Sequence, residues 1–162
     1  MSPLQRRMLK ELLQHLDELN VHIENLNDEI DNFMKPEEKQ ASQVIQDVTG
    51  IGNTSAQTIV AVIGTDMERF PSDRHISSWA GLCPGDNISA KKRKGGKIRK
   101  GNALLKSTLV LCAHAAVRHK SSYFHAQFKR ISTHRGKKRA YVAVAHSILI
   151  ACLLYTSPSP RD

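Results

Sequence analysis

Eight apolar residues near the N-terminus recur in alternating steps of three and four, and this repeat constrains the fold more than any other feature. They are Leu9, Leu12, Leu16, Leu19, Ile23, Leu26, Ile30 and Phe33. Such spacing places all of them on one helical seam with the 3.5-residue period that is typical of coiled coils. It predicts a coiled-coil arm over residues 1–40, formed between two copies of the chain or as an antiparallel arm. The alternative is one amphipathic helix that lies on its own domain.

This first helix is predicted to end at Pro36, because proline interrupts helical hydrogen bonding. The residues 36–39, Pro-Glu-Glu-Lys, are interpreted as the link to the next element.

Charge is divided unevenly along the 162 residues, whose formal net charge is +9. Residues 1–85 carry 7 basic and 13 acidic side chains, whereas residues 86–139 carry 16 basic side chains and one acid, Asp86. Such a strongly basic region implies a polyanionic partner. Nucleic acid fits better than an anionic membrane, because residues 91–101 offer only Ile98 as an apolar contact for lipid.

Several classes of protein are excluded by composition and pattern. No apolar run reaches the roughly 18 residues that a membrane span needs, and the N-terminus has no signal-peptide pattern, so no membrane partner and a cytoplasmic location are expected. The three cysteines, Cys83, Cys112 and Cys152, are too few and too scattered for a disulfide framework or a zinc site. No metal site is therefore predicted in this chain.

Residues 45–63 resemble a helix-hairpin-helix, with two short helices around a Gly-Ile-Gly turn. Glycines let the backbone approach a phosphate, and the N–H groups that begin the following helix point at it. The candidate DNA contacts are therefore Gly50, Gly52, Asn53 and Thr54. Ile51 is expected to plug the turn, and the core face is predicted to be Ala56, Ile59, Val60 and Ile63. The alternative is an ordinary glycine-containing turn in a helical bundle.

The remaining pattern predicts an all-α fold, in which a long N-terminal coiled-coil helix precedes a small helical domain over residues 41–151. A short helix begins at Ser72 or Asp73, and its apolar face is expected to comprise Ile76, Trp79 and Ala80. Residues 86–102 lack helical periodicity and predict a basic loop or hairpin. Helical patterns resume at Ala103, and the apolar stretch 140–151 is predicted to be the core helix.

The basic loop over residues 86–102 supplies all of the remaining candidate DNA-binding residues. They are Lys91, Lys92, Arg93, Lys94, Lys97, Arg99, Lys100 and Asn102. At the other end of the predicted domain, residues 152–162 change composition abruptly and look like an in-frame translation of a sequencing-library adapter. We expect them to be foreign to the fold.

Three stretches, TGIGNTSAQTI, FPSDRHISSWAGLCPGDNIS and KKRKGGKIRKGNALLK, carry a family resemblance. Together with the heptad arm, they resemble the C-terminal part of insertion-sequence transposases that pair a RuvC-like domain with a C-terminal serine domain and are guided by a bridge RNA. The resemblance covers roughly residues 45–151. One departure is Ala90, which stands where the family usually has glycine.

The resemblance implies that Ser89 is the nucleophile that joins to DNA, next to the cations that would stabilise the transition-state charge. It also implies a metal-binding domain upstream, so Mg²⁺ is expected for the complete enzyme and this fragment is expected to be inactive alone. The implied partners are DNA, a guide RNA and a second copy through the coiled coil. The alternative function is a non-catalytic helix-hairpin-helix DNA-binding module with a dimerising coiled coil.

Overall fold

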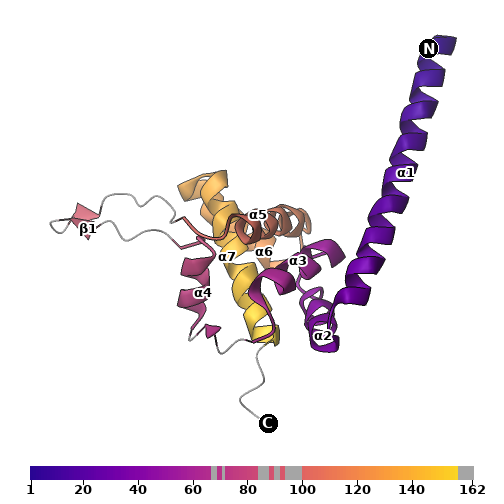
Figure 1. Ribbon diagram of the computed structural model, residues 1–162. Helices are drawn as coiled ribbons and strands as arrows, with labels where there is room; N and C mark the ends of the chain where they lie inside the picture. Colours follow the sequence, from indigo (N-terminus) through magenta and orange to yellow (C-terminus); the bar gives the residue numbers. More distant parts are fainter. Residues whose placement is uncertain (67–68, 71, 84–87, 90–91, 94–99, 157–162) are drawn as a thin grey trace. The chain divides into compact units, whose positions relative to one another are not determined.

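The computed structural model describes residues 1–66, 69–70, 72–83, 88–89, 92–93 and 100–156. Over these residues the protein is helical apart from one pair of two-residue strands, which confirms the predicted all-α class (Figure 1). The helices are α1 (Pro3–Phe33), α2 (Pro36–Ile45), α3 (Asn53–Ile63), α4 (Asp73–Trp79), α5 (Ala103–Arg118), α6 (Tyr123–Arg135) and α7 (Lys137–Thr156). The strands are β1 (Ile88–Ser89) and β2 (Lys92–Arg93).

The chain divides into two compact units, Met1–Lys35 and Pro36–Asp162. The first unit consists of α1, and the second contains every other helix. The predicted arm at 1–40, domain at 41–151 and foreign segment at 152–162 stay predictions.

Helix α1 begins with a capping box. The Gln5 N–H donates to Ser2 Oγ at 3.3 Å, and the Ser2 N–H donates to Gln5 Oε1 at 2.8 Å. This reciprocal pair satisfies two of the backbone donors that a helix start leaves open. The bounds of α1 confirm the predicted long N-terminal helix, while its pairing in a coiled coil stays a prediction.

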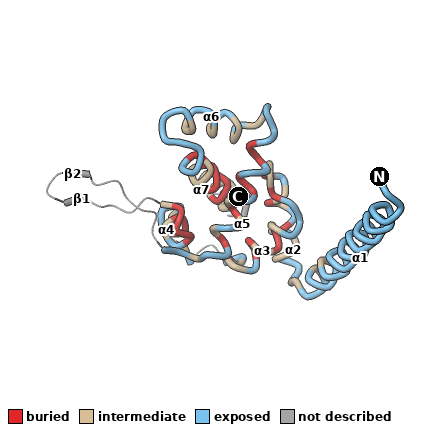
Figure 2. Tube along the Cα trace, turned by 90° about the horizontal axis from the view of Figure 1, so that it is seen from above, coloured by how far each residue is buried: buried red, intermediate tan, exposed pale blue. Residues whose placement is uncertain are grey.

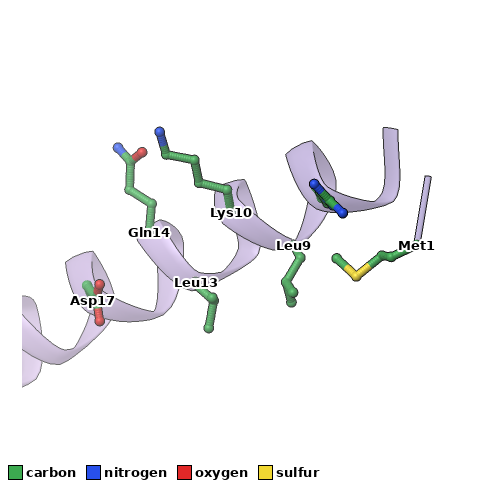
Figure 3. Close-up of a pocket in the computed structure, with 7 residues that line it drawn as sticks. Met1, Leu9, Lys10, Leu13, Gln14 and Asp17 are labelled. Atoms are coloured by element: carbon green, nitrogen blue, oxygen red, sulfur yellow. The ribbon is translucent and has the colours of Figure 1, made fainter. Parts of the chain in front are cut away.

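No residue of α1 is buried within its unit. The seam residues range from 42% exposed at Leu19 to 90% exposed at Phe33. Leu9 and Leu13 lie on the same side of the helix as Met1, whereas Lys10 and Gln14 lie on the other side (Figure 3). The helix therefore presents a continuous apolar stripe.

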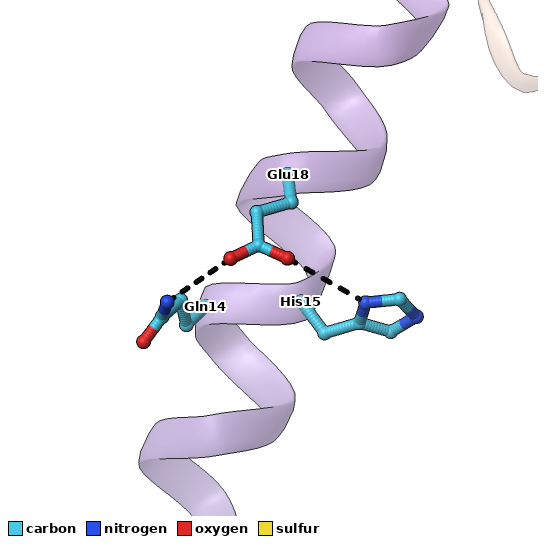
Figure 4. Close-up of polar contacts among 3 residues, drawn as sticks. All are labelled: Gln14, His15 and Glu18. Carbon is cyan, nitrogen blue, oxygen red and sulfur yellow. Dashed lines mark hydrogen bonds and ion pairs between the residues drawn. The ribbon is translucent and has the colours of Figure 1, made fainter.

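Polar side chains pair along the rest of the α1 surface. Gln14 Nε2 donates to Glu18 Oε1 at 3.0 Å, and His15 Nδ1 lies 3.9 Å from Glu18 Oε2 (Figure 4). One turn earlier, Arg7 Nε lies 3.5 Å from Glu11 Oε1. Contacts between residues three and four apart support a helix locally, but they contribute little when fully solvated.

The predicted link at residues 36–39 is wrong, because these residues form the first turn of α2. Proline at the first helical position loses no hydrogen bond, and its fixed φ suits a helix. Glu37 and Glu38 follow in the first turn, where the helix dipole favours negative charge. Pro36 therefore begins a helix as well as terminating the preceding one.

The core of the second unit forms around α7, which packs against α5, α6, α4 and α2 (Figure 2). The predicted core helix at 140–151 is confirmed, and it extends in both directions to Lys137 and Thr156. Its buried residues are Ala140, Val144, Ala145, Ile148, Leu149 and Cys152. Because α7 is apolar around much of its circumference, it can contact several helices at once.

Helix α5 lies between α3 and α7 and contacts both of them. It buries Leu105, Leu109 and Ala113 completely. Helix α6 packs against α5 and α7 from the outside and buries no residue fully. One side-chain hydrogen bond ties it to the core helix, from Gln127 Nε2 to Ser147 Oγ at 2.8 Å. None of the helices in the described parts of the chain is long and apolar enough to cross a membrane.

Candidate nucleic-acid interface

The turn between α2 and α3 has the predicted core. Ile51 is 7% exposed, and the predicted apolar residues of α3 are all buried: Ala56, Ile59, Val60 and Ile63. Gly50 adopts a φ of +97°, which only glycine adopts readily. A Cβ there would lie 2.5 Å from the Cys112 carbonyl oxygen and 2.7 Å from the Ala116 Cβ. The close approach of α5 therefore accounts for this glycine, and its contact with DNA stays a prediction.

The other predicted residues of the turn begin α3 on an exposed surface. Gly52 is the N-cap and, lacking a side chain, leaves the first turn of the helix uncovered by a capping group. A Cβ at Gly52 would meet nothing within 4 Å, and Asn53 and Thr54 are exposed. The first N–H groups of a helix lack partners within the helix and bind anions readily. Gly52, Asn53 and Thr54 are thus placed together, and their contact with DNA stays a prediction.

The Trp-Ala-Gly-Leu motif ends α4. The Gly81 N–H donates to the Ser78 carbonyl at 3.0 Å, and the Leu82 N–H donates to the Ser77 carbonyl at 3.0 Å. With Gly81 at a φ of +69°, this pair forms a Schellman motif. Leu82 is 3% exposed, so the chain turns back onto the core before the basic loop begins.

The two ends of the basic loop meet at this point. The Asn102 N–H donates to the Trp79 carbonyl oxygen at 3.1 Å. Gly101 packs so closely on Ala80 and Gly81 that a Cβ would overlap their backbone atoms. Asn102 Oδ1 also accepts from the Leu105 N–H at 3.0 Å and so caps α5, as asparagine does well. The described residues on the two sides of the loop, Gly81 and Gly101, are therefore held together at the junction of α4 and α5.

Within the loop, β1 and β2 pair antiparallel, with Ser89 opposite Lys92 and Ile88 opposite Arg93. This confirms a hairpin rather than a loop without regular structure. The predicted contacts Lys91, Lys94, Lys97 and Arg99 lie outside the described residues. Lys100 is exposed where the chain re-enters the described part. The roles assigned to Ser89 and to these cations stay predictions.

Positive charge continues from the loop over the last three helices. Residues 100–156 contain ten lysines and arginines and no aspartate or glutamate. Most of these cations are exposed, including Arg118, Lys120, Lys129, Arg130, Arg135, Lys137, Lys138 and Arg139. The DNA contacts predicted from sequence lie only in the loop and the Gly-Ile-Gly turn, although the same count of charges could have identified this surface.

One further site was missed, because Trp79 was expected on the apolar face of α4. Ile76 and Ala80 are indeed fully buried, but Trp79 is 41% exposed, so that expectation is wrong for the indole. The surrounding hollow is lined by Arg74, His75, Ser78 and Trp79. The available signal was a lone tryptophan with arginine and histidine one helical turn before it, at positions 74 and 75.

The described residues offer no fit for Mg²⁺. No three of their histidine, cysteine, aspartate or glutamate side chains are grouped to hold a metal ion. In the described part of the chain, none of Cys83, Cys112 and Cys152 forms a disulfide. Burial, and then the neighbouring Cys112, raise the pKa of Cys152 to about 12, and burial also raises the pKa of Cys112. Both buried thiols thus stay protonated and unreactive near neutral pH.

The sequence is similar to those of known transposases. Residues 42–129 match the family described as "Transposase IS116/IS110/IS902 family". The chain is 32% identical over 108 residues to the transposase for insertion sequence element IS1111A of Coxiella burnetii, covering 64% of this chain and 29% of that protein. It is 29% identical over 121 residues to an uncharacterised 43.6 kDa protein of insertion element IS110 of Streptomyces coelicolor, covering 72% and 30% respectively. The aligned region thus spans less than a third of each relative.

Proposed function

Because the chain belongs to the IS116/IS110/IS902 family of transposases, we propose that it binds DNA and supplies a serine nucleophile for transposition as part of a longer enzyme. The observation that carries this proposal is the anchored basic hairpin. Its two ends are joined by the hydrogen bond from Asn102 to Trp79, and it lies within the segment that matches the family. A loop fixed at both ends can hold a reacting group with less loss of conformational entropy on binding.

In the proposed reaction, the Ser89 hydroxyl attacks the phosphorus of a DNA phosphodiester. The new bond joins the serine oxygen to phosphorus, the bond to the leaving deoxyribose oxygen breaks, and that oxygen takes up a proton. The serine proton passes to a base. Lysines and arginines adjoin Ser89 in the sequence and supply positive charge for the pentacoordinate transition state.

The start of α3 and the loop cations position the DNA in this proposal. Gly52 and Asn53 offer backbone donors at an exposed helix start beside Thr54, and Lys100 continues the basic loop into α5. Such phosphate contacts fix the register of a duplex without reading its bases. Sequence choice would then rest with a guide RNA, the second nucleic acid that the resemblance implies.

The rest of the complete enzyme is proposed on the same basis. The α1 stripe pairs with a second copy, and Mg²⁺ enters through an upstream domain. The competing function, a non-catalytic helix-hairpin-helix module, uses the same α2–α3 turn and α1 stripe without strand attack by Ser89.

A covalent adduct distinguishes the two functions. The chain is joined behind the N-terminal part of the Coxiella relative, supplied with guide RNA, Mg²⁺ and labelled DNA, and denatured before electrophoresis. We expect a labelled protein–DNA band that disappears in Ser89→Ala and persists in Ser121→Ala, an exposed serine outside the hairpin. A band that survives Ser89→Ala would contradict the nucleophile assignment.

Salt dependence tests the proposed contacts separately. If six to eight phosphates are contacted, DNA affinity should fall by roughly 10³-fold or more between 50 and 200 mM salt. Replacing Lys91, Lys92, Arg93 and Lys94 with glutamine should reduce the slope by about one for each phosphate contact removed. If the dependence of DNA affinity on salt stayed unchanged in this variant, the loop would not contact the phosphates.

A further inference from the structure

Helix α4 carries an open hollow of about 470 Å³ at its surface, lined by Arg74, His75, Ser78 and Trp79. These residues lie on adjacent turns of one helical face, while Ile76 and Ser77 face the core and are fully buried. The hollow combines an indole ring, a guanidinium, an imidazole and a hydroxyl. No carboxylate is among these lining side chains.

The indole of Trp79 is held at the surface rather than in the core. Its ring centroid lies 5.5 Å from that of Phe70, and the two planes are inclined by 52°. This contact orients the indole, yet 41% of the residue stays exposed. Tryptophan offers a large apolar face whose contacts stabilise a complex when a partner covers it.

The polar side chains beside the indole suit a phosphate. Arg74 is exposed and always charged, and its guanidinium donates to phosphate oxygens in a fixed planar geometry. His75 is exposed, and its Nδ1 lies 2.8 Å from Ser72 Oγ. When the Ser72 hydroxyl donates to Nδ1, the ring proton resides on Nε2, which then donates outward. An aromatic face beside two such donors matches a nucleobase with its flanking phosphate.

The position of the hollow links it to the proposed reaction site. The Trp79 carbonyl oxygen accepts the hydrogen bond that closes the base of the loop, and Gly101 packs on the two residues that follow Trp79. Lys100 is exposed next to Gly101, so a DNA strand that contacts Lys100 passes close to the point where the loop joins α4. The same chain segment thus joins the aromatic face to the residues around Ser89.

We propose that Trp79 stacks on an unpaired nucleobase of the DNA strand, while Arg74 and His75 contact the phosphate next to it. The ligand is single-stranded or locally opened DNA, since both faces of a base inside a duplex are covered by its neighbours. This inference rests on the proposed function, because the loop brings the strand to the hollow. In this proposal, α4 holds a displaced base beside the reacting phosphodiester.

The chain contains one tryptophan, so its fluorescence reports on this ring alone. The full 162-residue chain is titrated with a labelled 12-nucleotide thymidine strand, and anisotropy of the label is recorded together with emission of Trp79. We expect both signals to saturate together, with indole emission falling by half or more. The same strand with abasic positions should bind without quenching, because it retains the phosphates but has no bases to stack.

Two outcomes overturn the inference in different ways. Saturating anisotropy with unchanged indole emission removes Trp79 from the interface but leaves the proposed DNA binding intact. Unchanged anisotropy with every strand, including a duplex, removes both the stacking site and the proposed DNA binding.

Variants of α4 separate stacking from charge. Trp79→Ala should weaken single-strand binding about 10-fold or more, whereas Trp79→Phe should retain most of the affinity because it retains a stacking ring. Arg74→Gln should lower affinity and salt dependence without abolishing quenching. The matched control is Tyr123→Ala, an aromatic residue that is 68% exposed on α6 and should have no effect. Equal affinities for Trp79→Ala and the unaltered chain would overturn the proposal even if Trp79→Phe failed to fold.

Discussion

Helices α1 and α7 are both rich in apolar residues, yet they differ completely in what they bury. Helix α7 places Ala140, Val144 and Ile148 at 0% exposure, whereas no residue of the 31-residue α1 is buried. The apolar residues of α7 surround the helix, so it can pack against several neighbours within its unit. The narrow stripe of α1 suits one partner helix along its length. The second unit therefore contains its own core, while the apolar stripe of α1 is left exposed.

The largest effect is expected where the second unit is packed most tightly. Gly50→Ala would place a Cβ 2.5 Å from the Cys112 carbonyl oxygen and force alanine to a φ of +97°. The strain and overpacking should lower the free energy of unfolding by about 3 kcal/mol or more. Urea titration followed by Trp79 emission measures it. Gly52→Ala is the matched control, because its Cβ would meet nothing within 4 Å.

A comparable loss from Gly52→Ala would show that the turn, and not its contact with α5, determines stability.

The second prediction concerns the α1 stripe. Leu19→Asp places a charge in the middle of the seam and should weaken self-association by about 2 kcal/mol, or roughly 30-fold in dissociation constant. Sedimentation equilibrium measures the dissociation constant. Val21→Asp is the matched control, because Val21 is 53% exposed and lies two residues off the seam. A chain that stays monomeric at high concentration would contradict pairing between copies.

The positions of the helices along the chain could largely be predicted from sequence, because apolar spacing reports directly on burial. The period of α1, the turn around Ile51 and the continuous apolar run of α7 each carried that signal. The predicted core residues Ile59, Val60 and Ile63 are all buried. The 36–39 link failed because Pro36 can both end one helix and begin the next.

The candidate site was less accessible to sequence reasoning, since its geometry depends on contacts distant in sequence. The contact of Gly50 with α5 and the hydrogen bond from Asn102 to Trp79 join residues 20 or more positions apart. No local pattern indicates such partners. Trp79 was misplaced because helical spacing fits both the edge of a buried face and an exposed ring that contacts Phe70.

A third, smaller effect tests the anchor at the base of the loop. Asn102→Ala removes the oxygen that accepts from the Leu105 N–H and should cost about 1 kcal/mol of stability. Thermal unfolding by circular dichroism measures it. Asn102→Asp retains a capping oxygen and should retain most of the stability. If the two variants were equally destabilised, the cap would not be the stabilising interaction at this position.

The smallest effect concerns the half-buried His146 of α7. Burial lowers the pKa of His146 below its ordinary value, partly offset by the negative charge of Asp73. The His146 imidazole therefore binds a proton more readily in the unfolded chain than in the folded chain. The stability that His146 contributes is present above its unfolded pKa and is lost as pH falls through its folded pKa. The melting temperature should decline between pH 7 and pH 5. The decline should be smaller in His146→Gln, while His134→Gln, which replaces an exposed histidine on α6, should follow the unaltered chain. An unchanged decline in His146→Gln would show that other groups cause the loss of stability at low pH and that His146 of α7 does not contribute to it.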